Sequence, residues 1–68
     1  MDEELRKLVL AEKPTFEGAR RRYVFPDQAR AACGRAAAVW AKQTGKPRHL
    51  AMTEACSAYW ELWEERKK

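Results

Sequence analysis

The fold is decided by residues 26–66, which read PDQARAACGRAAAVWAKQTGKPRHLAMTEACSAYWELWEER. Proline at the first position of a helix is pre-organised for it, and an acidic residue next to the proline suits the positive end of the helix dipole. Small and apolar residues then recur at helical spacing, namely Ala29, Ala32, Cys33, Ala36 and Trp40. This pattern predicts a helix over about 26–44.

A short connection follows this helix. Gly45 fits the left-handed position at which helices commonly end, and Pro47 begins the next helical segment. A second apolar stripe then consists of Met52, Cys56, Tyr59 and Trp63. Because helices joined by so short a connection lie side by side in opposite directions, we expect an antiparallel helical hairpin of about 26–44 and 47–66.

The segment before the hairpin predicts an N-terminal helix over about 2–13. Leu5, Leu8 and Val9 lie on one face of it, and Pro14 ends it because the residue before a proline avoids helical angles. The predicted fold is therefore all-α and forms one small domain over residues 1–68. In it, residues 1–19 are an N-terminal arm and residues 20–66 are the core.

Residues 19–25 are ambiguous. The β-favouring residues at the end of this segment favour a short strand that would pair with the same strand of a second chain. The spacing of Phe16, Ala19 and Tyr23 instead favours a further short helix. Both alternatives remain open from the sequence.

The positive charge is concentrated in the middle of the chain. The 68 residues include 14 Lys plus Arg and 10 Asp plus Glu, for a net charge of +4. Residues 20–48 alone hold eight Lys or Arg and one Asp, a balance of +7. Such an asymmetry favours a polyanionic partner. Arg20, Arg21 and Arg22 are adjacent in the sequence and repel one another, so we expect a partner to offset their charge.

Several classes of protein are excluded by what the sequence lacks. No apolar run approaches the ~20 residues of a membrane span, so we expect no membrane partner. The chain begins with acidic residues, unlike a secretory signal peptide, and two cysteines are too few for a disulfide framework. We therefore expect a cytoplasmic protein. Cys33 and Cys56 fall at the same height in the predicted hairpin, and two free, buried thiols are favoured over a disulfide.

Catalytic and metal-binding patterns are also missing. Cys33, His49 and Cys56 are the soft metal ligands of this chain, and their spacing matches no structural zinc site. The sequence contains no glycine-rich phosphate loop. A helical hairpin has little room for a deep pocket. We expect a protein that is not an enzyme and has no metal, no cofactor and no small-molecule substrate.

The apolar stripe of the second long helix is wider than one alanine-rich helix can cover. A chain of this length also buries a smaller share of its surface than larger domains do. These two points predict a homodimer with Trp60 or Trp63 in its interface.

Two stretches resemble the ribbon-helix-helix family of DNA-binding repressors, which are MetJ/Arc/CopG-like. Residues 23–27 look like the short strand of that family, which leads into a helix begun by proline. Residues 44–59 are similar to its pattern G-[KR]-S-x-S-x-x-[IL]-x-x-A-[IL]-x-x-Y, in which Pro47 replaces the usual Ser or Thr. The apolar places are filled by Met52, Ala55, Cys56 and Tyr59. The resemblance covers residues 20–66.

The resemblance implies a ribbon of two paired strands that enters the major groove of DNA. In this sequence Arg20, Arg22 and Val24 would point outward toward base edges, and Arg21 would point inward. The start of the second long helix would hold a phosphate. The implied nucleic-acid-binding residues are Arg20, Arg21, Arg22, Val24, Lys46, Arg48 and His49.

Two functions remain open on this basis. The first is a small dimeric DNA-binding protein, such as a transcriptional repressor or a phage or plasmid accessory factor, that uses the basic segment Arg20–Arg22. The second is an all-helical module that binds a protein partner, as an inhibitor or an assembly subunit. Its contact surface would be the aromatic face of helix 47–66, because aromatic residues dominate binding hot spots. The residues of that surface would be Met52, Tyr59, Trp60 and Trp63.

Overall fold

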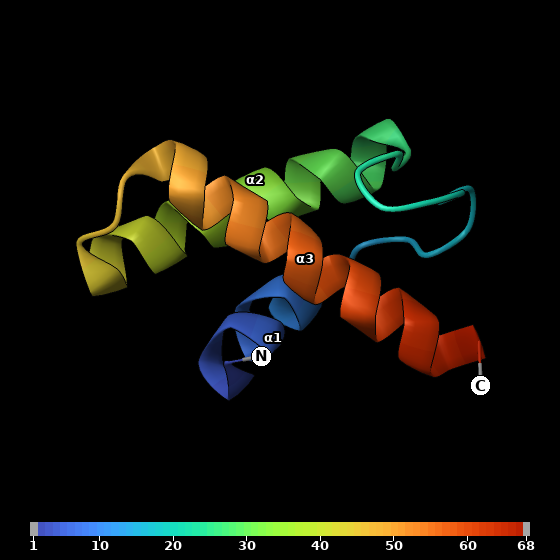
Figure 1. Cartoon of the computed structure of the whole chain (residues 1–68), viewed down its shortest axis with the longest axis horizontal. Coiled ribbons are helices and arrows are strands. Elements are labelled where there is room, and N and C mark those ends of the chain that lie inside the picture. Colours follow the sequence, from blue (N-terminus) through green and yellow to red (C-terminus); the bar gives the residue numbers. More distant parts are fainter. Residues whose placement is uncertain (1, 68) are drawn as a thin grey trace.

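A computed structural model describes residues 2–67 and has three helices in this range (Figure 1). They are α1 (Glu3–Ala11), α2 (Asp27–Thr44) and α3 (Arg48–Lys67). Residues 2–67 contain no strand, so the predicted all-helical fold is confirmed. None of these helices is long and apolar enough to cross a membrane.

Helix α1 begins close to its predicted start and is shorter than predicted at its end. The Asp2 side chain accepts a hydrogen bond of 2.8 Å from the backbone N–H of Glu4, which satisfies a free donor of the first turn. The helix ends at Ala11, two residues before the predicted end. Lys13 has a left-handed φ of 51°, which turns the chain away from the helix just before Pro14.

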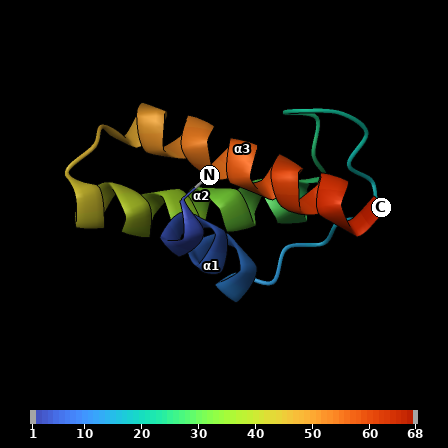
Figure 2. The same ribbon diagram turned by 60° about the horizontal axis from the view of Figure 1, so that its bottom comes forward.

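Helices α2 and α3 are joined by a short turn. Gly45 ends α2 in the left-handed conformation, with φ of 74°, and its N–H donates to the carbonyl of Ala41. From this turn α3 runs back over α2, and α1 lies against both (Figures 1 and 2). At the end of the molecule away from the turn, residues 12–26 form a long loop that connects α1 to α2 (Figure 1).

The core forms around Tyr59, which is fully buried. The loop contributes two aromatic rings to it: Phe16 is stacked on Tyr59 with ring centroids 5.1 Å apart, and Phe25 is tilted against it at 4.3 Å. Helix α1 adds Leu5 and Val9, which are also fully buried. The loop and α1 therefore cover part of the broad apolar face of α3 with residues of the same chain.

Residues 19–25 form neither the strand nor the helix that the sequence left open. They make a tight turn, in which Val24 N–H donates to the carbonyl of Arg21 at 2.9 Å and Arg20 N–H donates to the carbonyl of Val24 at 3.2 Å. The segment is not extended as a strand would be, because the single bridge between Arg21 and Val24 closes a turn over residues 22–23. A helix is blocked because Tyr23 has a left-handed φ of 69° and Pro26 follows closely.

Candidate nucleic-acid interface

The basic turn, defined as residues 20–24, presents three arginines to solvent. Arg20, Arg21 and Arg22 are all exposed. No carboxylate of residues 2–67 forms an ion pair with any of them. The family resemblance implied that Arg21 would point into the core. The structure instead exposes it to solvent. Val24 is exposed as well, whereas the neighbouring Phe25 is buried.

Side chains of α2 and α3 hold the basic turn in place. The guanidinium of Arg30 donates a hydrogen bond of 3.2 Å to the carbonyl of Tyr23, and it brings a fourth positive charge to the turn. The hydroxyls of Tyr23 and Ser57 are hydrogen-bonded at 3.3 Å. The arginines are thus displayed on a segment that is anchored to both long helices.

The other predicted nucleic-acid-binding residues lie at the opposite end of the molecule. Lys46, Arg48 and His49 belong to the α2–α3 turn and the start of α3 (Figure 1). The 18 residues of α2, at about 1.5 Å each, separate this turn from the basic turn by ~27 Å. The structure therefore does not bring the two predicted groups together.

Lys46 is used to hold the α2–α3 turn. Its Nζ forms an ion pair of 2.9 Å with Glu54 and lies 5.6 Å from the centre of the Trp40 ring. The indole N–H of Trp40 donates to the same carboxylate at 2.9 Å. The pKa of Glu54 is lowered, first by the Trp40 hydrogen bond and then by Lys46. Arg48 and His49 are exposed beside this group.

The four residues predicted as a partner interface are separated too. Tyr59 is fully buried, and its hydroxyl donates a hydrogen bond of 2.7 Å to the carbonyl of Thr15. Burial raises the pKa of Tyr59 to about 12. Met52 is half-buried and lines a small pocket of about 190 Å³ that also contains Cys56. Of the four, only Trp60 and Trp63 lie together at the surface, and both are half-buried.

These two tryptophans form a stack at the surface of α3. The rings of Trp60 and Trp63 are nearly parallel, with centroids 4.4 Å apart. The Phe25 ring of the loop is also nearly parallel to the Trp60 ring, with centroids 6.4 Å apart. The Nζ of Lys67 lies 5.1 Å from the centre of the Trp63 ring. The stack therefore has an aromatic neighbour from the loop at Trp60 and a cation at Trp63.

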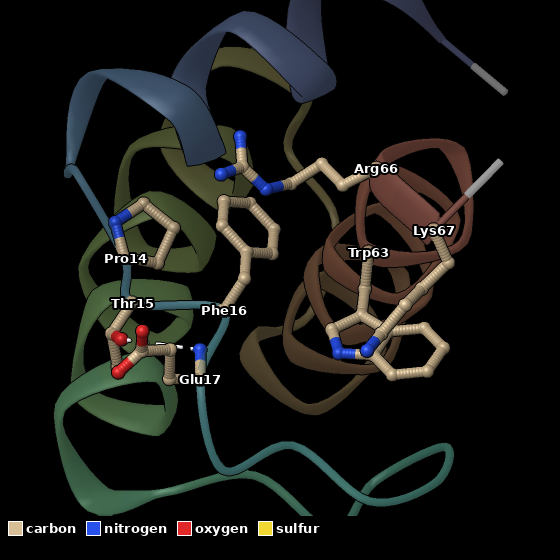
Figure 3. Close-up of a pocket in the computed structure, with 7 residues that line it drawn as sticks. All are labelled: Pro14, Thr15, Phe16, Glu17, Trp63, Arg66 and Lys67. Atoms are coloured by element: carbon tan, nitrogen blue, oxygen red, sulfur yellow. Dashed lines mark hydrogen bonds between the residues drawn. The ribbon is translucent and has the colours of Figure 1, made fainter.

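A pocket of about 490 Å³ lies between the loop and the end of α3 (Figure 3). Phe16 of the loop and Trp63 of α3 line opposite sides of it, and the guanidinium of Arg66 lies 4.6 Å from the centre of the Phe16 ring. The side chain of Glu17 also lines the pocket, but its carboxylate is directed toward Thr15 and away from Trp63. The complete lining is Pro14, Thr15, Phe16, Glu17, Trp63, Arg66 and Lys67.

The sequence patterns predict no binding role for three residues of this pocket, namely Phe16, Arg66 and Lys67. The spacing of Phe16 predicts only a place on the face of a possible short helix. One local signal was present, because the spacing of Trp63 and Lys67 places them on one face of a helix. The contact between Phe16 and Arg66 joins residues far apart in the chain and has no local signal.

Comparisons with protein-family models, with curated proteins and with solved structures give no match to this chain. Its function is therefore argued from the basic turn, the tryptophan stack and the pocket.

Proposed function

We propose that this protein binds nucleic acid through the three arginines of the basic turn. The observation that carries the proposal is the exposure of Arg20, Arg21 and Arg22 side by side with no carboxylate partner among residues 2–67. Adjacent guanidiniums repel one another, and a polyphosphate offsets this repulsion.

The contrast with other cations of the chain supports this reading. Arg6 is paired with Glu65 at 2.7 Å, Arg35 with Glu12 at 2.6 Å, and Lys46 with Glu54. These pairs tie α1 to α3, α2 to the loop, and the α2–α3 turn to α3. The arginines of the basic turn make no such pair within residues 2–67, so the fold does not use their charge.

The anchoring of the turn also favours a binding role. Because Arg30 and Ser57 hold Tyr23, the backbone that carries the arginines loses little additional freedom when a ligand binds. Guanidinium groups contact phosphates with two N–H groups at once, which makes arginine well suited to this partner.

A protein-interaction module is the less well supported function. Of the residues that would form its surface, Tyr59 is buried in the core and Met52 lines a separate pocket. Trp60 and Trp63 remain, and their neighbours Arg66 and Lys67 give that surface a positive border.

The test measures binding to fluorescently labelled DNA by anisotropy at several salt concentrations. We expect the slope of log affinity against log salt to become shallower by about 2 in the double variant Arg20→Ala, Arg22→Ala, because each lost phosphate contact removes about one unit. The matched control is Lys7→Ala, Lys42→Ala, which removes the same charge from exposed positions on α1 and α2, outside the basic turn, and should change the slope little.

Two outcomes would contradict the proposal. If both double variants weaken binding equally, net charge and not the basic turn governs the interaction. If the first double variant binds as the unmodified protein does, while circular dichroism shows that both are folded, the basic turn is not the site.

A further inference from the structure

We propose that the pocket between Phe16 and Trp63 binds one unstacked nucleobase of a single-stranded nucleic acid, with the adjoining phosphate on Arg66 and Lys67. This inference rests on the proposed function and names the form of nucleic acid that is bound. The proposal is based on the lining of this pocket, which has an aromatic ring on each of two sides and two cationic side chains.

The size of the pocket is suited to a small planar ligand. Its volume of about 490 Å³ falls within the range of about 300–1,000 Å³ that is usual for ligand pockets in proteins. Phe16 and Trp63 come from the loop and from α3, so the packing of the loop on the helix creates the space between them (Figure 3).

Each of the two aromatic rings that line the pocket is stacked on a second aromatic ring. Phe16 is stacked on the buried ring of Tyr59, and Trp63 is stacked on Trp60. The flexible side chains of Arg66 and Lys67 also lie over these rings, with the Arg66 guanidinium 4.6 Å from the centre of the Phe16 ring and the Lys67 Nζ 5.1 Å from the centre of the Trp63 ring. A base can displace such side chains and stack in their place, because every base has a π-face.

The charge of the pocket favours an anion. Neither Arg66 nor Lys67 forms an ion pair with a carboxylate within residues 2–67. Their two positive charges exceed the single negative charge of Glu17, which also lines the pocket, together with the partial negative charge of about half a unit at the C-terminal end of a helix. When a base moves them off the rings, both side chains remain close enough to contact its phosphate.

The loop wall of the pocket is formed before any ligand arrives. The backbone N–H of Thr15 donates to the Gln28 side chain at 2.6 Å, and the carbonyl of Thr15 accepts from Tyr59 at 2.7 Å. The Gln28 amide in turn donates to the carbonyl of Lys13 at 3.0 Å. Phe16 therefore extends from a backbone held by both α2 and α3.

The pocket and the basic turn lie on the same loop. Phe16 is four residues before Arg20, and the loop that carries both lies at the end of the molecule away from the α2–α3 turn (Figure 1). A single strand can therefore contact the arginines with its phosphates and place a base in the pocket. The bases of a duplex are stacked and paired, so a duplex cannot place a base there without opening.

The test compares three labelled DNA ligands of one length: a single strand, the same strand with abasic sites in place of its nucleotides, and the duplex. We expect the ordinary single strand to bind about 5- to 150-fold more tightly than the abasic strand, which is the range for stacking one base. We also expect it to bind more tightly than the duplex.

Variants locate this preference in the pocket. Trp63→Ala should reduce the affinity for the ordinary strand toward that of the abasic strand without changing the salt slope, and Trp63→Phe should restore most of it. Leu50→Ala is the control, because Leu50 is an exposed apolar residue near the other end of α3. Arg66→Gln with Lys67→Gln should make the salt slope shallower, and it gives a second readout if Trp63→Ala is unfolded.

The possible failures are distinguishable. If the ordinary and abasic strands bind equally, or the duplex binds most tightly, the base pocket is refuted and binding at the basic turn stands. If Trp63→Ala is folded and keeps the preference for the ordinary strand, the base lies elsewhere and the inference is overturned. If none of the three ligands binds, the proposed function and this inference both fail.

Discussion

At the scale of single residues, the two cysteines show how neighbouring groups acquire different reactivity. Both are free and buried, as the sequence predicted. The interaction between the two neighbouring thiols raises the pKa of Cys33 and lowers the pKa of Cys56. Burial adds to the increase at Cys33, and the charge of Arg30 helps to lower the pKa of Cys56.

We expect Cys56 to react before Cys33 with a small alkylating reagent such as iodoacetamide. The thiolate is the reactive form, and Cys56 also lines the 190 Å³ pocket, whereas Cys33 is fully buried. Peptide mass spectrometry after brief labelling of the folded protein near pH 8 would identify the modified residue. In Cys56→Ser, labelling should proceed only at the slow rate at which the core opens. Equal rates at the two cysteines in the unmodified protein would contradict this assignment.

At the scale of elements, the two glycines of the long helices have different roles. Gly45 ends α2 with a φ of 74°, a conformation that L residues with a side chain rarely adopt. Gly34 lies inside α2, where a close crossing with another helix would explain it. The structure has no such crossing, because a Cβ built at Gly34 would meet no atom within 4 Å. Gly34 therefore weakens its helix without permitting a closer contact.

Gly34→Ala should raise the free energy of unfolding by about 0.5–1 kcal/mol, because alanine loses less conformational freedom in a helix. Urea unfolding followed by circular dichroism at 222 nm measures this change. The matched variant Gly45→Ala should lower the same quantity by about 1 kcal/mol, since alanine is strained at a left-handed φ. A loss of stability in Gly34→Ala would show that α2 is packed more tightly at this point.

At the scale of the whole molecule, α1 is part of the core and not an arm beside it. Leu5 and Val9 are fully buried against the two long helices. Arg6 ties α1 to the last turns of α3 through Glu65, at 2.7 Å, and Glu61, at 3.9 Å. A chain of 68 residues forms a small core, and here α1 and the loop enlarge it.

Leu5→Ala should lower the free energy of unfolding by about 2–5 kcal/mol, because it removes a fully buried side chain and leaves a cavity. A domain of this size has a total stability of only about 3–10 kcal/mol, so this loss is at least about a fifth of the total. Leu10→Ala is the control on the same helix. Leu10 is 48% exposed, and its loss should change the same quantity by less than about 0.5 kcal/mol. Similar losses in both variants would mean that α1 does not dock as described.

Much of the helical structure follows from local patterns in the sequence. The spacing of apolar residues predicts α2 and α3 to within two residues, and Pro26 and Gly45 mark the ends of α2. The cluster of arginines at 20–22 can also be predicted from the sequence, because residues adjacent in the chain are close together in any fold. Local angles and periodicity are properties of short segments, so a short segment is enough to reveal them.

The loop and the pocket depend instead on contacts between residues far apart in the chain. The sequence of residues 19–25 fits both a strand pattern and a helix pattern. The segment forms a turn because Phe25 packs on Tyr59 and the Tyr23 hydroxyl is hydrogen-bonded to Ser57. Phe16 and Trp63 line one pocket although 46 residues lie between them. Lys46 and the basic turn are closer in sequence than these two, yet the length of α2 keeps them apart. Local sequence thus decides which segments are helical. The packing of side chains decides which charges and rings meet. The loop of residues 12–26 has no strong conformational preference of its own, so the burial of aromatic surface selects its path.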